Sequence, residues 1–131
     1  MLWVIIVVTL GMGIHESGLA STAVFTEDFE RGMERWNELW TRDQDVGKAG
    51  IDDSLRHKGR ASVKIEHTGQ KDWALLPEFI LDVRPGQIYQ LACWVQVRGE
   101  GRTTLCVTTR AQDDEVMEWT FAGRTTGQTK G

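Results

Sequence analysis

The sequence has little of what marks several large classes of protein. Its 131 residues include only two cysteines, two prolines and one tyrosine, and 15 basic residues face 19 acidic ones for a net charge of −4. Without an excess or cluster of Lys and Arg, the chain lacks the electrostatic footprint of a nucleic-acid-binding protein. Its composition, with 40% hydrophobic and 26% charged residues, is that of an ordinary globular domain.

Signatures of catalysis are missing as well. The sequence contains neither GxSxG nor HExxH, the motifs of many serine hydrolases and zinc peptidases. Its neighbouring acids Asp52-Asp53 and Asp113-Asp114 lie in expected turns, whereas a glycosidase needs two carboxylates about 5 to 10 Å apart across a cleft. The sequence therefore predicts a protein that is not an enzyme.

The beginning of the chain resembles an export signal. Residues Leu2 to Ile14 are apolar and uncharged, and small residues that include Ala20 and Ala23 follow them. The apolar run is shorter than the roughly 20 residues that cross a bilayer, and small residues at the cut are typical of signal-peptide cleavage. We expect residues 1–20 to be a signal peptide, cleaved after Ala20 or Ala23. The mature domain, residues 21–131, is then secreted or periplasmic and free of the membrane.

The rest of the chain has the pattern of a β protein. Short alternating runs are separated by Gly, Asp and Pro, and no apolar stripe repeats every 3.6 residues. The clearest alternation runs from Ala61 to His67, with an apolar or aromatic residue at every second position. Strands are expected at 24–29, 61–67, 73–76, 79–83, 88–97, 103–110 and 116–121. Seven short strands separated by turns indicate an antiparallel β-sandwich.

The two cysteines are not expected to form a disulfide. In the strand 88–97, Cys93 belongs to the apolar set of alternate residues, whereas Cys106 lies between Leu105 and Val107 on the opposite set. If the two strands pair as a hairpin, the sulfurs point to opposite sides of the sheet. A bond between them remains the less favoured alternative, and no Cys/His cluster predicts a zinc site.

Three segments, taken in order, carry a resemblance to a known family. They are Phe25-Thr26-Glu27-Asp28-Phe29-Glu30 followed by Gly32 and Trp36, then 56–65, then 83–95 with the run Pro85-Gly86-Gln87-x-Tyr89-x-Leu91-x-x-Trp94-Val95. Over most of residues 24–121 the chain is similar to CenC-like carbohydrate-binding modules. The resemblance implies a galactose-binding-domain-like jelly roll that binds a polysaccharide or oligosaccharide. It also implies a non-catalytic accessory role beside a linked, glycan-degrading catalytic domain.

Modules of this family end with further strands that have no counterpart here. Residues 122–131 are polar and rich in glycine, which is typical of a loop. We therefore expect a fragment that is incomplete at the C-terminus. Apolar surface should lie uncovered where the missing strands would pack.

A sugar-binding site needs exposed aromatic planes for the C–H faces of the sugar and polar groups for its hydroxyls. Trp94 shares a strand face with Gln96, opposite the apolar set, although a Trp that lies under a loop or covers a second small core would have the same position. Trp36 and Trp119 are assigned to the core. The carbohydrate-binding candidates are Trp94, Gln96, Trp40, Trp73 and Arg110.

The resemblance also implies a structural calcium ion near Glu30. Ca²⁺ takes six to eight oxygen ligands, of which Glu30, Asp28 and nearby carbonyl groups would supply a part. A solvated acidic patch is the alternative at this position. For the whole chain, the alternative to sugar binding is a structural or protein-interaction β-sandwich of an extracellular multidomain protein, with Trp94 buried against a neighbouring domain.

Overall fold

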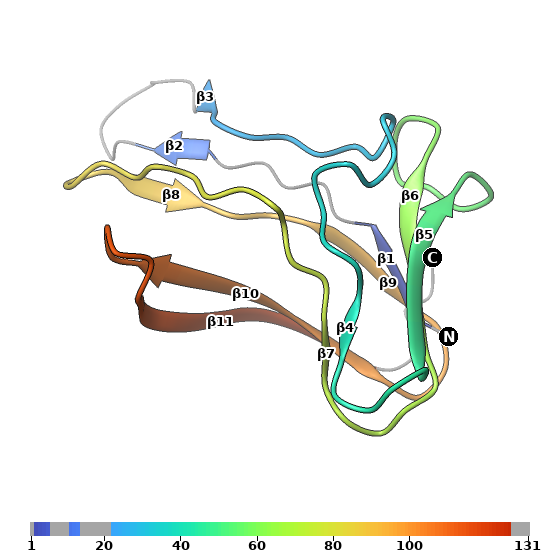
Figure 1. Cartoon of the computed structure of the whole chain (residues 1–131). Helices are drawn as coiled ribbons and strands as arrows, with labels where there is room; N and C mark the ends of the chain where they lie inside the picture. The colour runs from blue at the N-terminus through green and yellow to red at the C-terminus, as the bar shows by residue number, and fades with distance from the viewer. Residues whose placement is uncertain (1, 6–10, 14–21, 127–131) are drawn as a thin grey trace.

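A computed structural model describes residues 2–5, 11–13 and 22–126, and within these ranges the chain is all β (Figure 1). Every strand pair is antiparallel. This confirms the predicted fold class, since the architecture is consistent with a β-sandwich. No helix among the described residues is long and apolar enough to cross a membrane.

The strands form four sheets. The largest, in the order β5-β6-β1-β9, contains β5 (Gly47–Asp52), β6 (Ser62–His67), β1 (Leu2–Ile5) and β9 (Trp94–Val97). The second contains β3 (Thr22–Ala23), β2 (Gly11–Gly13) and β8 (Ile88–Gln90). The third pairs β10 (Arg102–Arg110) with β11 (Val116–Thr126), and the fourth pairs β4 (Trp40–Thr41) with β7 (Trp73–Ala74).

The core lies against one face of the largest sheet. The alternation predicted around β6 is confirmed, because Val63 and Ile65 are completely buried together with Val97 of β9. Phe29 and Trp36 from the loop before β4 pack onto these three side chains and complete the core cluster. Burying an aliphatic side chain of this size contributes roughly 1.5 to 3 kcal/mol.

The segment 24–29, predicted as a strand, has the burial pattern of a strand but no ladder with the described residues. Phe25, Glu27 and Phe29 are buried and the residues between them are exposed. The buried Glu27 carboxylate supplies the missing acceptors: Oε1 accepts the Phe29 N–H at 2.9 Å and Oε2 accepts the Trp36 indole Nε1–H at 3.2 Å. A side chain therefore replaces a neighbouring strand at this point.

Two further strand predictions were wrong. The expected strand 88–97 is divided between β8 and β9, which belong to different sheets. The expected strand 79–83 has no ladder, because Phe79 packs instead on Phe25 with ring centroids 4.5 Å apart. The Arg35 guanidinium lies over both rings, at 4.4 and 4.8 Å from their centroids. The attraction between the cation and the two ring faces stabilises this local packing.

The β10–β11 hairpin extends away from the largest sheet (Figure 1). The prediction of a loop at 122–131 was wrong for residues 122–126, because β11 continues to Thr126, which pairs with Arg102. Residues 127–131 lie outside the described part of the chain. The prediction of a core Trp119 was also wrong, since its side chain is 58% exposed. Its neighbours on the same side of the strand, Met117 and Phe121, are 71% and 67% exposed. No described strand covers this side of the hairpin.

The cysteines are free, as expected, and both are half-buried, whereas Cys93 was expected in the core. The predicted geometric reason was wrong, because β9 and β10 do not pair and the two sulfurs do not belong to one hairpin. Burial raises the pKa of the Cys93 thiol and, on the hairpin, that of Cys106. Both thiols are therefore held in the protonated, less reactive form.

The backbone of β1 belongs to the segment predicted as a signal peptide, and it lies between β6 and β9. Leu2 is opposite both Ile65 and Val97, which are two of the buried core positions. Removal of residues 1–20 would therefore take a strand from the middle of the largest sheet. Cleavage itself stays a prediction.

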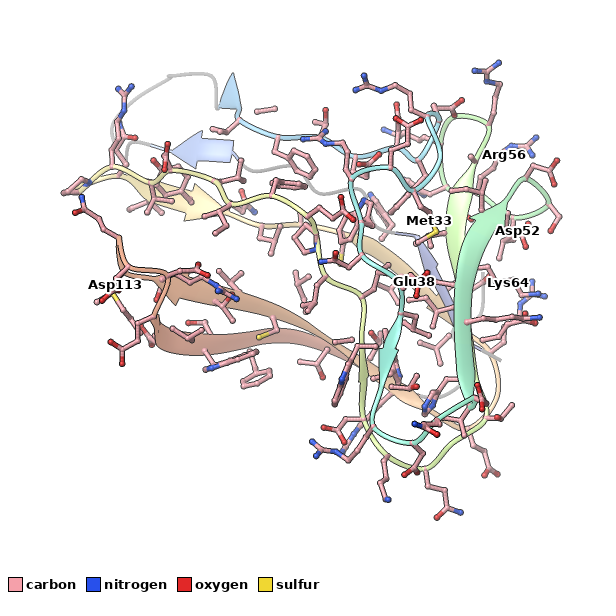
Figure 2. All side chains as sticks on the ribbon, viewed as in Figure 1. Met33, Glu38, Asp52, Arg56, Lys64 and Asp113 are labelled. Atoms are coloured by element: carbon pink, nitrogen blue, oxygen red, sulfur yellow. The ribbon has the colours of Figure 1, made fainter. Side chains whose placement is uncertain are left out.

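Changing Glu27 to Gln should destabilise the fold by about 1 to 3 kcal/mol, because the new NH₂ group must face one of two buried N–H donors that then lacks an acceptor. Urea unfolding followed by fluorescence measures the change. Glu38→Gln, an exposed change in the same loop (Figure 2), should leave the free energy of unfolding unaltered. Equal stability of Glu27→Gln and the unchanged protein would contradict the role given to Glu27.

A chain of residues 21–131 should unfold at a lower urea concentration than the full chain. It lacks β1, so β6 and β9 lose their shared neighbour and expose unpaired backbone groups. Comparison of the two unfolding midpoints tests this expectation. Identical midpoints would show that residues 2–5 contribute nothing to the sheet.

Candidate functional site

The face of the largest sheet that points away from the core carries the candidate site. In β9 the side chain of Val97 is buried and that of Val95 packs against the core cluster. Alternation then places Trp94 and Gln96 on the opposite face, and Trp94 is 57% exposed. Trp94 therefore points outward, as the sequence pattern predicted, and does not cover a second core.

Charged side chains continue this face on the neighbouring strands. The backbone of Trp3 lies opposite both Gln96 and Lys64, so these two residues share one face of the sheet. The Glu66 carboxylate forms ion pairs with Lys64 Nζ at 2.9 Å and with Lys48 Nζ at 3.0 Å. Hydrogen bonds from these two ammonium groups lower the pKa of Glu66. We call the set Trp94, Gln96, Lys64, Glu66 and Lys48 the outer face.

A loop far from β9 in the sequence reaches Trp94. The imidazole of His57, in the loop between β5 and β6, stacks on the Trp94 indole with ring centroids 3.9 Å apart and an interplanar angle of 19°. Sequence reasoning missed this contact, since a loop residue that packs on a strand leaves no periodic signal. The only local hint was an aromatic ring in a turn-rich segment that precedes a clear strand.

Polar contacts hold this loop in place. Asp52 Oδ1 accepts hydrogen bonds from Ser54 N at 2.7 Å, Ser54 Oγ at 2.5 Å and Leu55 N at 3.2 Å. The fully buried Ser62 donates its hydroxyl to the Leu55 carbonyl at 2.5 Å. Burial acts to raise the pKa of Asp52, but the hydrogen bonds from Ser54 and Leu55 outweigh it and lower the pKa. Figure 2 shows Asp52 and Arg56 at the tip of the β5–β6 hairpin.

Gln96 has an unusual environment beside Trp94. Its Oε1 atom is buried and has no hydrogen-bond donor within the described part of the chain. A buried acceptor without a donor costs roughly 1 to 3 kcal/mol. This buried oxygen lies in the strand next to the exposed indole.

The carbohydrate-binding candidates Trp40 and Trp73 do not share a surface. In the β4–β7 ribbon Trp40 lies opposite Ala74 and Thr41 lies opposite Trp73, so the two indoles face opposite sides. Trp73 packs against the core cluster, whereas Trp40 is 46% exposed.

A neighbouring cation lies over the ring of the exposed Trp40. The Arg42 guanidinium lies 5.6 Å from its ring centroid and binds both carboxylate oxygens of Asp72 at 2.6 Å. The side-chain hydrogen bond from Arg42 lowers the pKa of Asp72 to about 2. The charged group next to the Trp40 indole is therefore already bound to a carboxylate.

Arg110 lies at the end of β10, at the tip of the hairpin and away from β9 (Figure 1). Its Nη1 atom forms an ion pair with Asp114 Oδ1 at 2.9 Å across the turn. Of the five carbohydrate-binding candidates, only Trp94 and Gln96 therefore share a surface.

The predicted calcium ligands are engaged with protein groups. Glu30 Oε2 pairs with Arg60 Nε at 2.8 Å, and Glu30 Oε1 accepts the Arg60 backbone N–H. Asp28 Oδ1 accepts the Glu30 N–H at 3.1 Å. No group of three or more His, Cys, Asp and Glu among the described residues is arranged to hold a metal ion. This arrangement does not fit a Ca²⁺ site, which needs six to eight oxygens.

One hollow of the described surface is too small to enclose a small molecule. It lies beside Glu27 and Arg35, has a volume of about 90 Å³ and has no aromatic residue in its lining. Pockets that enclose a small molecule measure about 300 to 1,000 Å³. A ligand of the outer face would lie on an open surface.

Comparison with known proteins decides the family. The carbohydrate binding domain family matches residues 21–130. The chain belongs to this family. The match confirms the resemblance seen in the sequence, and membership supports a carbohydrate-binding role. No curated protein and no solved structure matched the chain.

The ion pair at Glu30 predicts a pH effect. Hydrogen bonds from Arg60 lower the folded-state pKa of Glu30 below its ordinary value of 4.5. The pair therefore stabilises the fold above about pH 4.5, and this contribution is lost as pH falls through the lowered folded pKa. Glu30→Gln should lower the urea midpoint at pH 7, and the difference from the unchanged protein should shrink as pH falls below 4.5 through the lowered pKa.

The same measurement tests calcium. Because Arg60 engages both Glu30 oxygens, millimolar CaCl₂ should leave the urea midpoint of the unchanged protein where it was. A calcium-dependent rise that is absent in Glu30→Gln would show that the ion displaces Arg60, and it would restore the predicted site.

Proposed function

We propose that this chain is a secreted, non-catalytic carbohydrate-binding module that holds a polysaccharide on its outer face. The observation that carries the proposal is the 57% exposed indole of Trp94 on a strand whose other side is anchored in the core. A flat apolar ring on a rigid strand suits the C–H face of a sugar. Binding by such a surface requires no catalytic group.

The polar neighbours of Trp94 support the same proposal. Gln96 lies on the same face, and within the described part of the chain its buried Oε1 accepts no hydrogen bond; the amide would have to turn outward to reach a sugar hydroxyl. The charged side chains of Lys64, Glu66 and Lys48 continue the surface across the sheet. Glu66 already pairs with Lys64 and Lys48. An ammonium group carries three N–H donors, and that of Lys48 is 77% exposed, so it would donate to a sugar hydroxyl without breaking its pair with Glu66.

The setting of the module is a further part of the proposal. The apolar segment at the beginning of the sequence supports export, and polysaccharides are substrates of extracellular enzymes. Cleavage after Ala20 would also remove β1 from between β6 and β9, so the proposed outer face is that of the full chain. A module without catalytic groups would serve as the accessory domain of a linked, glycan-degrading catalytic domain by holding that enzyme near its substrate.

A separate observation favours a second candidate function, a protein-interaction domain. Met117, Trp119 and Phe121 form an exposed apolar row on β11. The rings of Trp119 and Phe121 are nearly parallel at 14° and lie 6.4 Å apart. Exposed apolar patches with large aromatic residues mark many protein interfaces.

Affinity electrophoresis of the full chain distinguishes the two. In native gels that contain xylan, β-glucan, mannan or galactan, we expect retardation in at least one. Trp94→Ala should weaken this binding at least about tenfold, because it removes the stacking surface. Trp119→Ala is the matched control, since the two indoles are 57% and 58% exposed; it should keep the retardation.

Circular dichroism should show that both variants remain folded. Retardation lost in Trp119→Ala and kept in Trp94→Ala would move the sugar site to the hairpin. Unchanged migration of the folded protein in every gel would contradict the proposed function and favour the protein-interaction domain.

A further inference from the structure

His57 and Trp94 form the closest face-to-face ring contact of the outer face. Their centroids are 3.9 Å apart with an interplanar angle of 19°, so the imidazole covers one face of the indole. The two rings come from different elements, the β5–β6 loop and β9. The contact therefore joins the tip of one hairpin to the strand that carries the candidate sugar-binding ring.

The exposure of Trp94 shows which role His57 has. Although the imidazole lies on one face, 57% of the Trp94 surface remains accessible. An imidazole is smaller than an indole, so exposure of this size leaves indole surface on which a sugar could lie. His57 therefore lies behind the ring, and it does not close the ring off from solvent.

A ring on an exposed strand would otherwise adopt several side-chain rotamers. Binding a sugar would then have to immobilise it, which lowers the affinity. A second ring stacked behind the indole removes this loss only if the second ring is itself fixed.

The loop that carries His57 meets this condition at both ends. Asp52 caps its beginning through three hydrogen bonds, to Ser54 and Leu55. At its end Arg60 is held by the Glu30 carboxylate through its backbone and its guanidinium. Both ends of the loop are therefore fixed by hydrogen bonds, and the exposed His57 lies between them.

We infer that His57 is a positioning residue of the sugar-binding site, which fixes the plane of Trp94 so that its open face meets the sugar. This inference rests on the proposed function and adds to it a residue outside the strands. It also assigns a purpose to the polar contacts that order the β5–β6 loop.

Four proteins test the inference in the gel that retards the unchanged chain. His57→Ala should weaken polysaccharide binding about 3- to 10-fold through the lost preorganisation. His57→Phe keeps a flat ring and should bind within about twofold of the unchanged protein. Lys58→Ala, an exposed change in the same loop, should bind as the unchanged protein does. Equal thermal midpoints would show that the affinity change is not a loss of folding.

Affinity that is unchanged or higher in His57→Ala overturns the inference, and higher affinity would mean that His57 competes with the sugar for the indole. Weakening that His57→Phe does not reverse also overturns it, because the flat ring would then not be the cause.

A measurement without sugar separates this inference from the proposed function. The ring protons of His57 should show upfield NMR shifts from the indole that vanish in Trp94→Ala. If these shifts are present and no gel retards the chain, the proposed function fails while the ring contact stands. If the shifts are missing, the inference fails whether or not the chain binds sugar.

Discussion

The structure depends on one buried carboxylate. Glu27 accepts the backbone N–H of Phe29 and the indole N–H of Trp36, and these two aromatic residues complete the core beneath β6 and β9. A chain segment without a neighbouring strand normally leaves its backbone donors unpaired, at a cost of about 1 to 3 kcal/mol for each buried group. The Glu27 side chain meets that need, and the packed aromatics then support the sheet whose outer face carries Trp94.

Two more carboxylates extend this principle to the loop between β5 and β6. Asp52 orders the beginning of the loop and Glu30 holds its end through Arg60. The carboxylate that the family resemblance marked for calcium therefore binds an arginine in this chain. Because the loop brings His57 onto Trp94, side chains that contact no ligand determine how the candidate site is presented.

Period-two alternation predicted the parts of the fold that depend on local pattern. It located β6 with its buried Val63 and Ile65, and it placed Trp94 outward. The turn at 84–87 has the geometry that its Pro-Gly pair favours, because Gly86 has a φ of 77° and Gln87 N donates to the Arg84 carbonyl at 3.4 Å. The prediction that Trp119 lies in the core was wrong. The alternation of residues along a strand shows which side chains share a face, but it does not show whether another part of the chain covers that face.

The sequence by itself determined the all-β class, the family and the outward position of Trp94 beside Gln96, since each depends on residues close together in the chain. The tertiary structure alone decided that 88–97 serves two sheets, that Arg110 and Trp73 lie apart from Trp94, and that His57 stacks on it. These facts depend on which distant segments meet. That choice is made by the burial of the whole apolar surface and by the pairing of buried polar groups such as the Glu27 carboxylate, and no local pattern encodes it.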